Sequence, residues 1–127
     1  HLVGLDNTEG LLPSELSGGM KKRAAIARAL ALEPDLIFLD EPSAGLDPVT
    51  AAELDELIVA LNRDLGLTVV VVTHDLDSIQ RIGKRCIMLD RATRRIIAEG
   101  DPRELREHSQ DPRVRAFFHR TPKDATS

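Results

Sequence analysis

The sequence is poor in cysteine, aromatic side chains and long apolar runs. Its single cysteine, Cys86, excludes an intrachain disulfide framework and is typical of a protein in a reducing cytoplasm. No apolar run approaches the ~20 residues that a membrane-spanning helix needs. The formal net charge of −4 provides no basic field for nucleic acid, and the small cluster of Arg91, Arg94 and Arg95 contains no aromatic residue. These absences argue against a disulfide-stabilised, membrane-spanning or nucleic-acid-binding protein.

The segments that are present alternate between strand-like and helix-like patterns, which predicts an α/β fold. Leu36–Leu39 is a short, unalternated apolar run, typical of a strand buried on both faces of a parallel sheet. Residues 67–73 form a β-branched run and predict a second strand. Residues 49–65 predict an amphipathic helix between the strands, and residues 75–83 predict a shorter helix after them. The apolar stripe of the longer helix consists of Leu54, Leu57, Ile58, Leu61 and Leu65.

The C-terminal third of the sequence predicts smaller elements. Residues 86–89 and 96–98 are apolar, flank an arginine-rich turn and predict a β-hairpin. Asp101 followed by Pro102 is typical of a helix N-cap with proline at the first helical position. A last short helix is expected over residues 114–118.

A helix start is predicted at Ser17–Met20, within residues 16–20, which read L-S-G-G-M. Ser17 is a good N-cap, and Gly18 and Gly19 permit another group to approach the backbone closely. The unpaired N–H groups and the positive dipole end of a helix start favour bound anions. The basic residues 21–23 follow in the first turn, where the dipole disfavours cations unless a phosphate docks there. The plain alternative is a serine-capped surface helix with a solvated basic turn.

Polar residues follow both predicted strands, where open α/β sheets bind ligands. Asp40 and Glu41 end the first strand, so that Asp40 can hold a hydrated magnesium ion and Glu41 can orient or deprotonate an attacking water. A strand that ends in an acidic turn capped by Pro42 is the structural alternative. His74 ends the second strand, where it can reach a γ-phosphate or simply bond a nearby carbonyl.

A turn and a further helix cap lie between the two strands. Gly45 permits a tight turn, and Asp47 before Pro48 suits the N-cap of the helix that follows.

Together and in this order, these motifs resemble those of the ATP-binding-cassette (ABC) ATPases. The resemblance runs from about Pro13 to about Gly100 and implies the C-terminal portion of a P-loop NTPase (RecA-like) domain with parallel strands, followed by a hairpin and short helices. No G-x-x-x-x-G-K-[ST] loop occurs in the sequence, so the phosphate-cradling half is expected to lie outside these residues. The expected organisation is the end of a helical subdomain over residues 1–16, the signature helix and ATPase core over 17–100, and a helical tail over 101–127.

The resemblance also implies a role for each site residue. In this family two subunits dimerise head to tail around two ATP molecules. Ser17, Gly18 and Gly19 would contact the γ-phosphate of ATP held by the partner subunit, and Asp47 would lie in the dimer interface. The subunit's own ATP would be served by Asp40 (through a water-bound Mg²⁺), Glu41 and His74.

The implied function is that of an ATP-hydrolysing subunit, with ATP and Mg²⁺ as cofactors, bound to a membrane permease at the cytoplasmic face of the cell membrane. The signature residues 16–23 and the segment 45–50 resemble those of the Mce-type (Mla-like) phospholipid and solvent-tolerance transporters, which implies a lipid or other hydrophobic cargo. Lys84 and the turn 91–95 depart from the usual family pattern and lie outside the catalytic motifs.

Two alternatives remain open beside a transporter subunit. One is a soluble ABC ATPase that acts on DNA or ribosomes, and the other is a short, non-catalytic chain that dimerises. Because the sequence contains no phosphate-cradling loop, the chain alone is expected to be inactive. The family's sheet places the histidine-bearing strand beside the P-loop strand, so this strand is expected to expose an apolar edge that promotes self-association.

Overall fold

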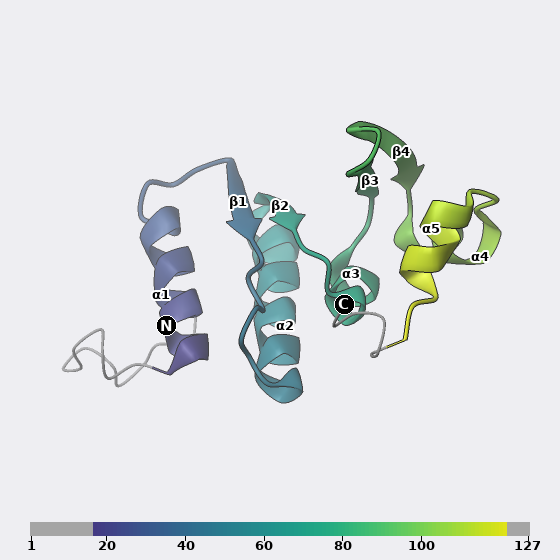
Figure 1. The fold of residues 1–127 in the computed structure, drawn as a ribbon. Coiled ribbons are helices and arrows are strands. Elements are labelled where there is room, and N and C mark those ends of the chain that lie inside the picture. Colours follow the sequence, from purple (N-terminus) through teal and green to yellow (C-terminus); the bar gives the residue numbers. More distant parts are fainter. Residues whose placement is uncertain (1–16, 122–127) are drawn as a thin grey trace. The chain divides into compact units, whose positions relative to one another are not determined.

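The structure is a computed structural model that describes residues 17–121, and the chain divides after Ser78 into two compact units (Figure 1). The interpretation of residues 1–16 as the end of a helical subdomain lies outside the described residues, as does the segment 122–127. The predicted α/β class is confirmed, with a parallel strand pair in the first unit and an antiparallel hairpin in the second.

The first unit is built around a β-α-β arrangement. Helix α1 (Gly18–Leu30) precedes strand β1 (Leu36–Asp40), and helix α2 (Pro48–Leu65) leads from β1 to strand β2 (Thr68–Val72). The strands are parallel and in register from the pair Leu36 and Thr68 to the pair Asp40 and Val72. This register brings the carboxyl ends of β1 and β2 together at one edge of the sheet. Helix α3 (Leu76–Ile82) follows and crosses the division between the units.

The strand pair is covered on one face, where Ile37 is buried and the β2 side chains are partly exposed. Ile37 belongs to the core, whereas Phe38 is 71 % exposed and Val72 is 57 % exposed. The prediction that Leu36–Leu39 is buried on both faces is therefore wrong for the described residues. Successive side chains of a strand point to opposite faces, and the described helices of this unit bury only one of them. The uncovered face carries Leu36, Phe38, Val70 and Val72.

The core of the first unit is the apolar side of α2. The predicted stripe is buried at Leu54, Leu57, Ile58 and Leu61, and Ile26 of α1 and Ile37 of β1 are buried as well. Leu65 was predicted to belong to this stripe and is instead 54 % exposed. It is the last residue of α2, because Gly66 follows with a left-handed φ of 66° and its N–H bonds Asn62, so the chain leaves the helix there.

The second unit contains the predicted hairpin and two short helices. Strands β3 (Cys86–Asp90) and β4 (Arg95–Gly100) are antiparallel, with a register shift between Met88 and Leu89. Helix α4 (Pro102–His108) begins at the predicted N-cap Asp101, whose carboxylate accepts from the Arg103 N–H. Helix α5 (Pro112–Phe118) contributes Val114 and Phe118 to the buried residues of this unit.

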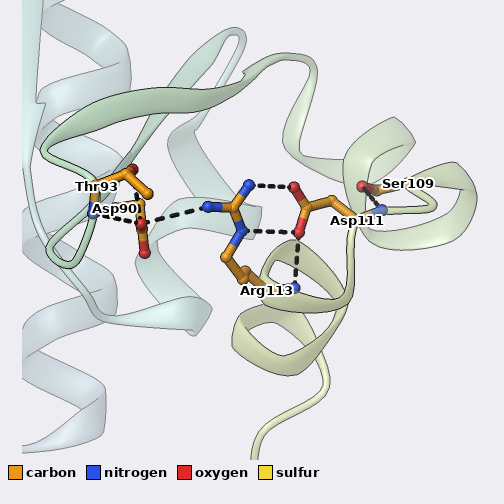
Figure 2. Close-up of polar contacts among 5 residues, drawn as sticks. All are labelled: Asp90, Thr93, Ser109, Asp111 and Arg113. Atoms are coloured by element: carbon orange, nitrogen blue, oxygen red, sulfur yellow. Dashed lines mark hydrogen bonds and ion pairs between the residues drawn. The ribbon is translucent and has the colours of Figure 1, made fainter.

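A charged network ties the start of α5 to the hairpin turn. Figure 2 shows the Arg113 guanidinium between two carboxylates, bonding Asp111 at 2.8 and 3.1 Å and Asp90 at 3.3 Å. Asp90 also accepts from the N–H and hydroxyl of Thr93, which closes the turn. The hydrogen bond from Arg113 lowers the pKa of Asp111 to about 2. The network fastens α5 to a surface turn and lies apart in sequence from the motifs of the first unit.

Candidate active site at the ends of the parallel strands

Asp40 and Glu41 lie where β1 ends, beside the end of β2. Asp40 is the last residue of β1 and is exposed. Glu41 follows it, and its N–H bonds the Val72 carbonyl at 2.7 Å, which continues the contact between the strands. The structure therefore places both predicted acids at the carboxyl edge of the sheet, with His74 two residues beyond the end of β2.

The carboxylate of Glu41 is held at both of its oxygens. His74 Nδ1 lies 2.6 Å from Oε1, and the Thr73 hydroxyl donates to Oε2 at 3.1 Å. The Thr73 oxygen in turn accepts from the Asp75 N–H at 3.0 Å. A carboxylate oriented by a hydroxyl and an imidazole on a neighbouring loop is suited to accept a proton or to orient a water.

The backbone of Glu41 is unusual. Its φ is +46°, a left-handed conformation that a non-glycine residue adopts at a cost of about 1–3 kcal/mol. The Lys22 ammonium group donates to the Glu41 carbonyl at 3.4 Å, and the N–H of Ala44 bonds the same carbonyl at 3.1 Å. These contacts stabilise a turn that directs the Glu41 side chain toward Thr73 and His74.

The predicted helix start at Ser17 is confirmed as a capped N-terminus. The Ser17 hydroxyl accepts from the Met20 N–H at 3.1 Å, and Ser17 and Gly18 are exposed. Two of the three basic residues that follow have partners within the unit. Lys22 bonds the Glu41 carbonyl, and the Arg23 guanidinium lies 4.0 Å from the Glu53 carboxylate. The presence of Lys22 and Arg23 in the first turn therefore does not require a phosphate.

The glycines of the signature have a packing role that the sequence analysis did not find. A Cβ at Gly19 would lie 2.7 Å from the Thr50 methyl, and one at Gly18 would lie 3.2 Å from Leu46 Cδ2. Thr50 and Leu46 belong to the start of α2 and to the loop before it. The start of α1 thus packs closely against the start of α2 and the loop before it that carries Asp47 (the aspartate loop), which requires a residue without a side chain at position 19.

Asp47 forms the predicted N-cap of α2. Its carboxylate accepts from the N–H groups of Val49 and Thr50, each at 3.1 Å, and from the Thr50 hydroxyl at 2.6 Å. The Thr50 hydroxyl, followed by the Thr50 N–H, lowers the pKa of Asp47. The carboxylate is thus ionised and fixed in an exposed loop.

The site residues therefore form two groups within the first unit. Glu41 and His74 are in contact, and Asp40 adjoins them in sequence at the end of β1. Ser17, Gly18 and Gly19 instead adjoin the aspartate loop that carries Asp47. Thr73 was not predicted as a contact of Glu41, although its position directly before His74 offered a signal.

Comparison with known proteins shows to which family this chain is similar. The ABC transporter family matches residues 2–44. Over 116 residues, the chain is 50 % identical to the intermembrane phospholipid transport system ATP-binding protein MlaF of Escherichia coli (strain K12), covering 91 % of this chain. The chain belongs to the ABC transporter ATP-binding proteins. It spans only 42 % of the length of this curated relative.

Solved structures of the family superpose on this ABC chain. CbiO1 from Clostridium perfringens, part of the ABC transporter complex cbiONQ, matches with a TM-score of 0.77 and 33 % identity over 96 % of this chain and 47 % of its own. The ATP-binding cassette MJ0796, in a dimeric post-hydrolysis state bound to ADP and Pi, matches with a TM-score of 0.60 and 42 % identity over 70 % of this chain and 37 % of its own. None of the helices described for residues 17–121 has both the length and the apolar character that crossing a bilayer requires.

Proposed function

We propose that this chain is part of an ATP-hydrolysing subunit that drives a membrane transporter, and that Glu41 is its catalytic base. The observation that supports this most directly is the Glu41 carboxylate, held by Thr73 and His74 at the carboxyl ends of two parallel strands. Family membership favours ATP as the substrate of such a site.

Each residue of this group has a distinct task toward the subunit's own ATP. Glu41 accepts a proton from the attacking water, or orients that water, in the position set by Thr73. His74 contacts the γ-phosphate from the neighbouring loop. Asp40 is an exposed carboxylate beside Glu41, and carboxylate oxygens are the ligands that Mg²⁺ prefers, so it fits a magnesium ion held through water. When bound, the ion neutralises charge on the phosphates.

The second group serves a different ATP molecule. We assign Ser17, Gly18 and Gly19 to the γ-phosphate of ATP held by a second copy of the subunit, and Asp47 to the interface between the copies. The capped helix start with two exposed residues is suited to an anion. The dimeric state of the MJ0796 cassette supports a pair of subunits, which we propose to be head to tail.

A transporter subunit of this kind would act at the cytoplasmic face of the membrane through a permease. The membership of cbiO1 in the complex cbiONQ is consistent with such a partner. The 50 % identity to MlaF favours a phospholipid or another hydrophobic cargo. Reconstitution of the complete transporter in phospholipid nanodiscs tests the cargo. Labelled phospholipid is expected to move between membranes only when Mg-ATP is supplied, and movement that is independent of ATP would contradict this assignment.

The substitution Glu41→Gln in the complete ATP-binding protein tests the proposed base. The amide keeps the size of the side chain but cannot take up a proton, so kcat for ATP hydrolysis is expected to fall by about 10²–10⁴. Calorimetric titration should show an affinity for Mg-ATP within about threefold of the wild type, because the interaction lost acts in the transition state. The matched control is Glu56→Gln, since Glu56 is an exposed carboxylate on α2. Wild-type turnover in Glu41→Gln would refute the assignment.

A further inference from the structure

A carboxylate outside the site just described is buried in the first unit. Asp55 on α2 has no exposed surface, although charged side chains are almost never fully buried without partners. The Ser78 hydroxyl lies 3.1 Å from one oxygen of Asp55 and 2.9 Å from the other, and Ser78 is itself only 2 % exposed. The pair joins the middle of α2 to α3.

The contact continues from Ser78 to the loop after β1. The hydroxyl oxygen of Ser43 is 3.5 Å from that of Ser78 and 3.3 Å from Asp75 Oδ2, so that either atom can accept the Ser43 hydrogen. A hydroxyl has one hydrogen to donate. Because Ser78 gives its hydrogen to Asp55, it can only accept from Ser43. The hydrogen of Ser43 therefore goes to Ser78 or to Asp75.

The members of this network adjoin both halves of the proposed catalytic pair. Ser43 lies two residues after Glu41, and Asp75 lies directly after His74. Asp75 also fixes the start of α3, since its other oxygen accepts from the N–H groups of Asp77 and Ser78. The loop of Glu41 and the loop of His74 are thus fastened to one buried carboxylate of α2.

We propose that Asp55, Ser78 and Ser43 form a positioning network that keeps Glu41 and His74 at hydrogen-bonding distance. None of the three touches the reacting atoms. The network acts through the loops that carry Glu41 and His74. A displacement of Ser43 would move the turn in which Glu41 adopts its left-handed backbone conformation. This inference depends on the proposed function in so far as Glu41 is the base whose position matters.

The decisive variant is Ser43→Ala in the complete ATP-binding protein. It cuts the link between the Glu41 loop and the network while the Asp55–Ser78 pair stays intact, so no buried carboxylate loses its donor. We expect kcat for ATP hydrolysis to fall by about three- to tenfold, the effect of one lost hydrogen bond. KM for Mg-ATP should stay within about twofold, because the network does not bind the nucleotide. Ser43→Thr keeps the hydroxyl and should restore kcat, and Glu56→Gln on the exposed side of α2 is the control.

Hydrogen exchange gives a second readout that does not depend on turnover. In Ser43→Ala, the amides of Glu41, Ala44 and residues 73–75 should exchange faster than in the wild type, while those of residues 54–61 should not change. Unchanged kcat together with unchanged exchange in these loops would overturn the positioning role. Wild-type turnover in Glu41→Gln would instead refute the proposed function, so the two failures are distinguishable.

Discussion

The close packing of Gly19 against α2 makes the substitution Gly19→Ala a quantitative test of the structure. The new Cβ would lie 2.7 Å from the Thr50 methyl, a distance that requires movement. Thr50 cannot turn away freely, because its hydroxyl bonds the Asp47 carboxylate at 2.6 Å in the cap of α2. Overpacking of this kind costs about 1–3 kcal/mol. Replacing glycine within a helix returns about 0.5–1 kcal/mol of backbone entropy. With mid-range values of these two terms, the expected net loss in the free energy of unfolding is about 1 kcal/mol.

Urea denaturation of the complete ATP-binding protein measures this loss, and two further variants show its cause. Gly18→Ala is the matched control, because its Cβ would meet the flexible end of Leu46 at 3.2 Å and should cost less. The double variant Gly19→Ala with Thr50→Ser removes the clashing methyl and keeps the capping hydroxyl, so it should recover most of the lost stability. A Gly19→Ala protein as stable as the wild type, or a double variant with no recovery, would refute the packing argument.

Three further predictions concern the proposed base Glu41, the charged network of Arg113 and Asp111, and the uncovered strand β2. Thr73→Val removes one hydrogen bond to the Glu41 carboxylate, so kcat for ATP hydrolysis should fall about tenfold; unchanged kcat would show that Thr73 does not orient the base. Arg113→Ala should raise the pKa of Asp111 from about 2 toward 3.8, and NMR titration of the carboxyl group measures this change. In the wild type, the ionised Asp111 stabilises the fold at pH values above 3.8, and this contribution is lost as the pH falls from 3.8 through about 2. An Asp111 pKa that is the same in the variant would contradict the network. The isolated 127-residue chain should self-associate in sedimentation experiments through the uncovered strand β2, and Val70→Lys should reduce this association; a wild-type chain that stays monomeric would count against the exposed edge.

The sequence predicted those features that depend on neighbouring residues. The caps at Ser17, Asp47 and Asp101 were predictable because a capping side chain bonds N–H groups two or three residues away. The order of the strands and the helix between them was predictable from their distinct apolar periods. The placement of Glu41 near His74 followed from the parallel pairing of the strands that precede them.

Features that depend on how distant elements meet were not predictable. The need for glycine at position 19 arises from its contact with Thr50 on another helix. No local sequence pattern indicates that α1 and α2 approach each other at this point. The buried Asp55 lies in an otherwise ordinary amphipathic helix, and its contact with Ser78 joins it to a residue 23 positions away in the sequence. Phe38 was expected to be buried because it lies in an apolar run, but it is exposed. An apolar run does not show which face of a strand is covered.

The two residue groups of this chain are proposed to serve two different ATP molecules in a dimer of the complete subunit. Heterodimers test it most directly. Each dimer carries one Glu41→Gln and one Ser17→Glu substitution, placed either on the same subunit or on opposite subunits. In a head-to-tail pair, the opposite-subunit arrangement leaves one intact site and should retain about half of the wild-type turnover, because a twofold dimer has two equivalent sites. The same-subunit arrangement damages both sites and should be nearly inactive. Equal turnover in the two arrangements, or the reverse order, would contradict the account.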